Sequence, residues 1–285
     1  MFGFLNVYKP KGKTSHDVVA ILRHATKIKQ IGHTGTLDPF AEGVLPICIG
    51  KATRLIEYLK DDKAYVGTVQ LGKSTTTYDI EGDVVNVSDK IISKEEIESA
   101  LKIFRGNIEQ LPPIYSAIKV NGKKLYEYAR KGQAVDVKPR MVNIKEIKIL
   151  NYDNVNSQLE LYISCSKGTY IRSIANDLGE KLGTYGYLIK LVRVKAGDFG
   201  INNSVKLKEL ETKEQVEKHI INPLEYLDYP KYELSEDEFE KVSHGNSINV
   251  SKFLPKGFVI LTHNTELISV AKNNNEIIKC EKVFI

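Results

Sequence analysis

The spacing of apolar residues predicts strands and helices in alternation along the chain. Residues 64–71 alternate between apolar and polar positions, which is typical of a strand with one buried face, and residues 44–49 form an apolar run of strand length. In residues 15–29 apolar residues recur every three or four positions, which predicts an amphipathic helix that Ser15 caps. The remaining predicted segments are strands at 4–8, 141–150, 158–166, 257–262, 266–272 and 276–284, helices at 53–60, 94–105 and about 172–182, and a hairpin at 115–120 with a turn at Asn121-Gly122.

These segments do not follow the regular repeat of a βαβ fold, so the chain is predicted to be α+β with a mixed sheet. Near residue 225 the sequence changes to an acidic stretch, 233–240, followed by short strands and turn-rich segments. We therefore expect two domains, one over residues 1–225 and a small β-rich one over residues 226–285.

Composition places the chain among ordinary globular proteins. Of its 285 residues, 42% are apolar and 27% are charged, which excludes fibrous and wholly disordered classes. No apolar run approaches the ~18 residues of a membrane span, and the N-terminus lacks the charge order of a secretory signal. Cys48, Cys165 and Cys280 are too widely separated for a zinc or disulfide framework. These features predict a protein of the reducing cytoplasm.

Positive charge is concentrated in the first two thirds of the chain. Residues 201–285 hold 11 Lys plus Arg against 14 Asp plus Glu, a net charge of −3, whereas residues 1–200 hold 30 against 22, a net charge of +8. Clustered cations suit a polyanion such as nucleic acid, because neutralised phosphates release their counterions. A lysine-rich solvated surface explains the same distribution equally well.

Several common catalytic motifs are missing from the sequence. It contains no phosphate-binding loop, no dinucleotide-binding glycine motif and no nucleophile elbow, and its six histidines lack metal-ligand spacing. The sequence therefore calls for no cofactor and no metal ion.

The segment from Gly32 to Pro39 interrupts all regular structure. Its glycines allow tight turns, and Pro39 restricts Asp38 to extended conformations, so this carboxylate is presented at the end of a loop with His33 nearby. An ordinary turn, in which Asp38 caps the next element, also fits, and spacing alone favours that interpretation.

Resemblance to a known family favours a catalytic role for this segment over an ordinary turn. The run GHTGTLDPFAEGVLPICIGKATR, residues 32–54, closely resembles the catalytic motif of the tRNA pseudouridine-55 synthases, which are B-type or TruB-like pseudouridine synthases. Four further family motifs follow the family's order: GFLNVYKPKGKTSHDVV before this run, and KAYVGTVQLGKSTTTYDIEG, LPPIYSAIKVNGKKLYEYARKG and CSKGTYIRSIANDLGEKLG after it. The motifs lie within residues 3–198, and the tail resembles the small PUA-type RNA-binding domain of many members. Thr36 and Phe40 depart from the commoner alanine and leucine without removing a reactive group.

The resemblance implies a pseudouridine synthase fold, with a mixed, mostly antiparallel central sheet flanked by helices and a PUA-like C-terminal domain. It implies an isomerase that flips uridine 55 out of the tRNA T-loop, breaks its N1–C1′ bond and rejoins the uracil through C5. No cofactor is expected, because reactant and product contain the same atoms. The expected partner is the T-arm of tRNA, with no membrane and no obligatory protein partner, and we expect a monomer in the cytoplasm.

The same resemblance assigns candidate site residues. Asp38 is the expected nucleophile, Arg172 its ionic partner, and Tyr65 the aromatic side chain that stacks on the flipped uracil. The other residues with expected substrate contacts are His33, Asp79, Tyr170, Leu191 and Arg193, the last as a phosphate contact, and Lys9, Lys11 and Lys13 along the RNA backbone. Taken singly, the aromatic and aliphatic residues fit an ordinary core, and the cations fit a solvated surface.

Three other functions are compatible with parts of the sequence. A guide-RNA-dependent pseudouridine synthase shares the core motifs, although this chain begins at its first strand. A tRNA-binding or folding module would not need the catalytic set of Asp38, Tyr65 and Arg172, which is present. A nucleoside or glycoside hydrolase usually needs two positioned carboxylates, of which the motifs support one.

Overall fold

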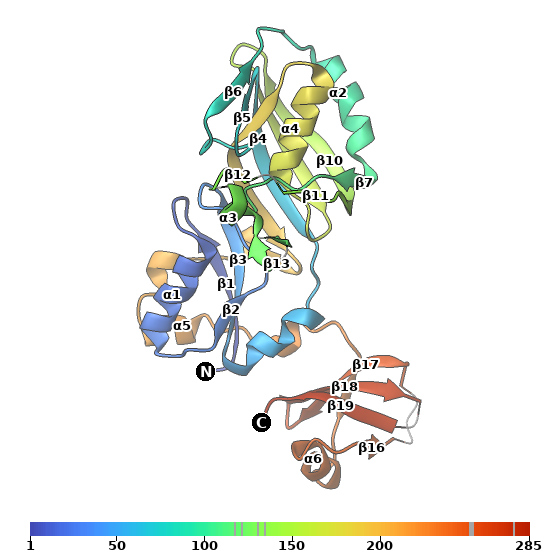
Figure 1. Cartoon of the computed structure of the whole chain (residues 1–285). Helices are drawn as coiled ribbons and strands as arrows, with labels where there is room; N and C mark the ends of the chain where they lie inside the picture. The colour runs from blue at the N-terminus through green and yellow to red at the C-terminus, as the bar shows by residue number, and fades with distance from the viewer. Residues whose placement is uncertain (117, 121, 130, 134, 251–253, 276) are drawn as a thin grey trace.

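The structure is a computed structural model that describes residues 1–285 except 117, 121, 130, 134, 251–253 and 276. The predicted turn at Asn121 lies outside the described residues. Figure 1 shows an elongated molecule, with a small C-terminal sheet at the opposite end from helices α2 (Lys94–Leu101) and α4 (Ile171–Leu182).

A ten-stranded mixed sheet forms the centre of the molecule. Its order is β14-β1-β3-β12-β4-β11-β10-β7, with β2 beside β3 and β13 beside β12. Two of these pairs are parallel, β1 with β14 and β3 with β12, and the other pairs are antiparallel. The strands are β1 (Gly3–Lys9), β2 (Ile31–His33), β3 (Glu42–Ile49), β4 (Lys63–Leu71), β7 (Gly106–Gln110), β10 (Arg140–Asp153), β11 (Gln158–Cys165), β12 (Gly186–Ala196), β13 (Phe199–Gly200) and β14 (Val205–Lys206). The predicted α+β fold with a mostly antiparallel sheet is confirmed.

Two helical groups pack on this sheet and enclose separate apolar cores. Helices α2 and α4 lie over β4, β10 and β12, whereas α1 (Ser15–Thr26) and α5 (Lys213–Lys218) lie beside β1 to β3. Residues 34–41 leave the second group at β2 and insert Leu37 and Phe40 into the first core. This loop therefore lies where the two parts of the sheet meet.

The other short elements are β5 (Lys73–Thr75), β6 (Val84–Val87), β8 (Lys119–Val120), β9 (Lys123–Lys124), α3 (Leu125–Ala129), and the 3₁₀ helices η1 (Gly50–Tyr58), η2 (Lys102–Phe104), η3 (Ile201–Asn203), η4 (Leu207–Glu209) and η5 (Pro223–Glu225).

Local sequence explains where the predicted elements begin and end, and where the prediction was wrong. Thr14, not Ser15, caps α1 in a capping box with Asp17, and the helix ends at Thr26 rather than residue 29 because Lys27 is left-handed, with φ 59°. Strand β12 was not predicted, because two register shifts, at Leu188/Lys190 and Arg193/Lys195, break its two-residue period.

The C-terminal domain is β-rich, as predicted. Its sheet has the order β15-β17-β18-β19-β16, and helix α6 (Glu236–Ser243), which the sequence did not predict, packs on it. The strands are β15 (Lys231–Glu233), β16 (Ile248–Asn249), β17 (Gly257–His263), β18 (Glu266–Asn274) and β19 (Ile277–Val283). Phe284 packs in one apolar cluster with Phe4, Phe199 and Ile260, so this sheet shares buried surface with β1. The boundary at residue 225 stays a prediction.

Within the described ranges, no helix is both long and apolar enough to cross a membrane.

Candidate active site

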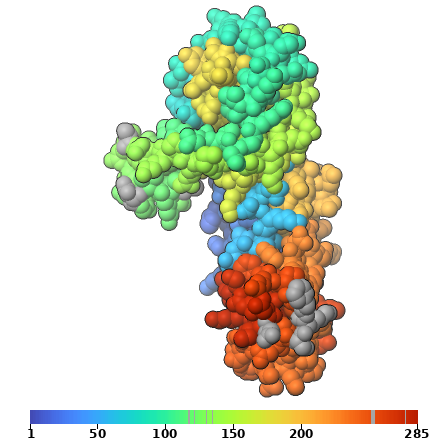
Figure 2. All heavy atoms as spheres, turned by 90° about the vertical axis from the view of Figure 1, so that its right-hand side faces the viewer, coloured from blue at the N-terminus to red at the C-terminus, as the bar shows by residue number. Residues whose placement is uncertain are grey.

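A pocket of about 490 Å³ opens where the Asp38 loop meets the start of α4. Five of the predicted site residues line it: Asp38, Tyr65, Tyr170, Arg172 and Leu191. The other lining residues are Gly35, Thr36, Leu37, Pro39, Lys63, Tyr115, Ser116, Tyr126, Gly168, Thr169 and Ile171. Four segments far apart in the sequence, those of Tyr65, Tyr115, Tyr170 and Leu191, thus converge on the Asp38 loop. Figure 2 shows the segment that carries Tyr126, coloured green, projecting from the side of the molecule.

The Asp38 loop is fixed by hydrogen bonds to the N-terminal part of the chain. The Leu37 N–H donates to Ser15 Oγ at 2.8 Å, and Ser15 Oγ donates back to the Leu37 carbonyl at 3.2 Å. Pro39 accepts a backbone hydrogen bond from Gly12 at 2.8 Å. Because both neighbours of Asp38 are held in this way, its carboxylate has a defined position, and its side chain is 34% exposed to the pocket.

Arg172 pairs with Asp38 from the first turn of α4. Its Nη2 donates to Asp38 Oδ1 at 3.4 Å, and its Nε lies 2.9 Å from Oδ2 without the angle of a hydrogen bond, so the second contact is an ion pair. The guanidinium also donates to the carbonyls of Thr77 and Tyr115, each at 3.0 Å. With its side chain only 5% exposed, Arg172 is held by backbone acceptors on two sides and presents its remaining edge to Asp38.

Asp79 lies behind this pair and does not line the pocket. One of its oxygens is 3.4 Å from Arg172 Nη1, and the other accepts hydrogen bonds from the Thr77 hydroxyl and the Glu81 N–H. Burial raises the pKa of Asp79, while the Thr77 hydrogen bond and Arg172 oppose that rise. The contacts make it a second anchor for Arg172.

Tyr65 and Leu191 form a buried wall of the pocket on adjacent strands. Tyr65 pairs with Arg193 across β4 and β12, and Leu191 pairs with Gly67, where a side chain would crowd the Leu188 methyl group and touch that of Leu191. Tyr65 is 7% exposed, and its burial raises the pKa of its phenol, so the phenol stays neutral.

Tyr170 is positioned by Gln110, which the sequence did not suggest. The Gln110 side chain accepts a hydrogen bond from the Tyr170 N–H at 2.7 Å and donates to the Tyr170 carbonyl at 3.0 Å. Tyr170 is the N-cap residue of α4, two positions before Arg172. Gln110 therefore fixes the start of the helix that carries Arg172.

The structure corrects the role predicted for Arg193. Its side chain is fully buried, so it is not a phosphate contact. Nε donates to the Val44 carbonyl at 2.7 Å, Nη2 to Gly35 at 2.9 Å and Nη1 to Thr36 at 3.3 Å. The guanidinium instead fastens the Asp38 loop to β3 and β12.

A similar correction applies to Lys9, which was expected to touch the RNA backbone. It is fully buried, and its Nζ donates to the carbonyls of Lys13, Pro10 and Pro39 at 2.6, 3.0 and 3.5 Å. Burial lowers the pKa of Lys9 to about 8, although the Asp38 carboxylate opposes that shift. Lys11 and Lys13, by contrast, are exposed.

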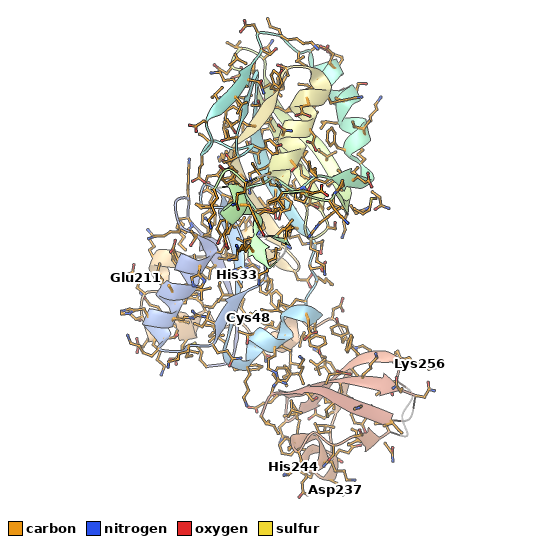
Figure 3. The ribbon with its side chains drawn as sticks, in the orientation of Figure 1. His33, Cys48, Glu211, Asp237, His244 and Lys256 are labelled. Atoms are coloured by element: carbon orange, nitrogen blue, oxygen red, sulfur yellow. The ribbon has the colours of Figure 1, made fainter. Side chains whose placement is uncertain are left out.

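His33 does not line the pocket. It is the last residue of β2, and Figure 3 shows it near the junction of the two helical groups. Burial and the charge of Arg193 lower the pKa of His33, and its Nδ1 is buried without a hydrogen-bond partner among the described residues. The structure therefore brings it near the loop but not to the carboxylate.

Sequence reasoning missed Lys63, Gln110 and Ser116. Lys63 could have been found, because it precedes Tyr65 by two positions in a strand and so shares its face. Gln110 and Ser116 reach the site through tertiary contacts that no local period records. In the described ranges, no group of three His, Cys, Asp or Glu side chains is arranged to hold a metal ion.

Comparison with known proteins places the chain in a family. Residues 23–171 match the model of the TruB family pseudouridylate synthase N-terminal domain, and residues 172–227 match that of the tRNA pseudouridylate synthase B C-terminal domain. The chain belongs to the TruB family of pseudouridine synthases. As a TruB family member it is an RNA-modifying isomerase that acts on tRNA.

Relatives of this TruB family member match over nearly the whole chain. It is 42% identical to the tRNA pseudouridine synthase B of Clostridioides difficile (strain 630) and 41% identical to that of Staphylococcus haemolyticus (strain JCSC1435), with 99% of each chain covered. Among solved structures, it resembles a Cbf5-Nop10-Gar1 complex at a TM-score of 0.74 and 25% identity, over 100% of this chain and 85% of the other. An H/ACA RNP bound to a substrate RNA has the same TM-score at 23% identity, with the same coverage, and shows the fold alone.

Proposed function

We propose that this synthase converts uridine 55 of the tRNA T-loop to pseudouridine, with Asp38 as its nucleophile. The observation that carries the proposal is the Asp38–Arg172 pair at the wall of a pocket that Tyr65, Tyr170 and Leu191 also line. The pocket volume falls within the ~300–1,000 Å³ typical of small-molecule sites, and a flipped nucleotide is such a ligand.

The chemistry starts with a uridine extruded from the T-loop so that its ring lies against Tyr65. Asp38 is ionised, and the Arg172 guanidinium stabilises its charge and directs one oxygen towards the sugar or the base. A carboxylate there can form a covalent adduct or stabilise the cation-like ribose while the N1–C1′ bond breaks. The detached uracil rotates, C5 bonds to C1′, C5 loses its proton and N1 gains one.

The residues around the reacting base have separate roles during these steps. Tyr65 and Leu191 exclude water, which protects the cleaved glycosidic bond from hydrolysis while the base rotates. Tyr170, half-buried at the start of α4, encloses the ring from the side of Arg172. Asp79, Gln110 and Arg193 act by position, because each holds a group that lines the pocket.

An unmodified tRNA transcript incubated with the protein alone tests this proposal. Carbodiimide modification followed by reverse transcription should give one new stop, at the T-loop uridine, and a transcript with cytidine at that position should give none. A stop elsewhere would refute the proposed target. Failure of the protein alone, with activity after addition of a guide RNA, would favour the guide-dependent alternative.

A further inference from the structure

Lys63 places an unpaired positive charge at the wall of the pocket. Only two described lining residues are basic, Lys63 and Arg172, and Arg172 already donates to the carbonyls of Thr77 and Tyr115 and pairs with Asp38. Among the described residues, Lys63 Nζ donates to the Asp61 carbonyl alone, at 3.1 Å, although an ammonium group has three N–H donors. Within the described chain, no carboxylate lies within ion-pair distance of it: the neighbouring carboxylates of Asp61 and Asp62 pair with Lys167 and Lys145 instead.

The Lys63 ammonium lies directly against the Asp38 loop. A methyl group placed on Gly35 would lie 3.1 Å from Lys63 Cε, 3.5 Å from its Nζ and 3.8 Å from Arg193 Nη1. The glycine therefore leaves room for the lysine to reach the pocket, three residues before Asp38. Arg193 at this point has three carbonyl acceptors, whereas Lys63 has one.

The surroundings of Lys63 favour an anion. Its side chain is half-buried, and burial together with the charge of Arg193 lowers the pKa of Lys63. A half-buried cation beside a second cation, with two N–H groups that have no acceptor in the described part of the chain, is stabilised when an anionic oxygen enters. In an RNA substrate each nucleotide brings such oxygens on its phosphates.

The position along β4 indicates which part of a nucleotide would lie there. Lys63 is two residues from Tyr65 on the same strand face, a displacement of about 7 Å towards the N-terminal end of the strand, where Lys63 is the first residue. The uracil ring is proposed to lie against Tyr65, and the phosphates of one nucleotide are displaced from its base by a comparable distance. An ammonium group at the strand end is therefore placed for the backbone rather than for the ring.

We propose that Lys63 binds a non-bridging phosphate oxygen adjacent to the flipped uridine, and so positions that nucleotide over Asp38. Lys63 is a positioning residue in this role. The proposal rests on the proposed function, since it assumes that the target base enters this pocket. It adds a phosphate contact inside the pocket, in place of the one that buried Arg193 cannot make.

A double-mutant cycle between protein and RNA tests the contact. T-arm hairpins are made with a neutral methylphosphonate in place of the phosphate on the 5′ or the 3′ side of the target uridine. Binding of each hairpin to wild type and to Lys63→Gln is measured over a range of salt concentrations. Lys63→Arg tests whether retained charge rescues binding, and Lys94→Gln, at an exposed lysine on α2, is the matched control.

Lys63→Gln should weaken binding of the unmodified hairpin by about ten- to a hundredfold, as expected for loss of a charge-assisted contact. It should also reduce the slope of log K against log salt by about one. One of the two methylphosphonate hairpins should bind wild type more weakly than the unmodified hairpin by a similar factor. The same methylphosphonate should cause no further loss of affinity when the protein is Lys63→Gln. Lys63→Arg should recover most of the affinity, and Lys94→Gln should change nothing.

Additive losses for both methylphosphonates would overturn the proposal. Unchanged affinity and salt slope with slower pseudouridine formation would also overturn it, because the lysine would then act on the base. The experiment measures binding affinity, so its result can be told apart from a test of pseudouridine formation. Coupling without pseudouridine formation keeps the contact and refutes the function, and pseudouridine formation without coupling does the reverse.

Discussion

Replacing Arg193 by methionine is the sharpest test of how the Asp38 loop is held. Methionine fills a similar volume but donates no hydrogen bonds, so the carbonyls of Gly35, Thr36 and Val44 lose their guanidinium partner. We expect a less stable protein with a displaced loop, and no loss of any contact to RNA phosphate.

The structure sets the expected size of the effect. A buried carbonyl left without a donor costs about 1–3 kcal/mol. Val44 is fully buried and should incur such a cost, whereas Gly35 and Thr36 border the pocket, where water can replace the lost donors. Removing the buried charge offsets part of the loss. We therefore expect Arg193→Met to lower the free energy of unfolding by about 1–2 kcal/mol.

Urea unfolding followed by far-ultraviolet circular dichroism measures this loss, since the chain contains no tryptophan. Lys195→Met is the control, because Lys195 is an exposed cation on the same strand. The variant should also form pseudouridine at least tenfold more slowly, because a small misplacement of a reacting group is costly. Its tRNA binding should keep the wild-type salt dependence. Stability within about 0.5 kcal/mol of wild type, together with a salt slope reduced by about one, would refute the role of Arg193 in holding the Asp38 loop. It would support the original prediction that Arg193 contacts an RNA phosphate.

Three further predictions concern groups that support the site or join the two sheets. Lys9 has a pKa of about 8 in the folded protein, below its ordinary 10.5, so the unfolded chain binds more protons between these values. The free energy of unfolding should therefore rise with pH over this window by up to about 3 kcal/mol relative to Lys9→Met, and a pH-independent difference in urea titrations would contradict this. Gln110→Ala should cost about 1–2 kcal/mol in urea unfolding and slow pseudouridine formation by releasing Tyr170, while Glu109→Ala, at an exposed neighbour, should do neither. Phe284→Ala should destabilise the protein by about 3 kcal/mol, because this ring is buried against Phe2 and the shared cluster, and a loss below 1 kcal/mol would show that the cluster contributes little.

Much of the fold could be predicted because local sequence and tertiary structure agree. The alternating pattern of residues 64–71 became β4, and Gly183, with φ 68°, ends α4 where the sequence indicated. The central strand β12 could not be predicted, because its register shifts exist only through pairing with β4. Helix α6 was missed because its acidic sequence hides the apolar contacts that it makes in three dimensions.

The site was only partly predictable for a related reason. Motifs locate Asp38, Tyr65 and Arg172, and the structure brings all three to one pocket. A motif does not say whether a cation faces solvent or the interior, so Lys9 and Arg193 were given the wrong role. Burial depends on which strands become neighbours, and the partners of Arg193 are about 150 residues away in sequence.

The central claim is that Asp38 is required to isomerise a single T-loop uridine. The most direct measurement uses a tRNA transcript labelled with tritium at C5 of its uridines, incubated with wild type or with Asp38→Asn. Wild type should release about one tritium per tRNA, and Asp38→Asn should release none while binding the tRNA within a few-fold of wild type, because phosphate contacts dominate affinity. Tritium release by Asp38→Asn at the wild-type rate would contradict the account.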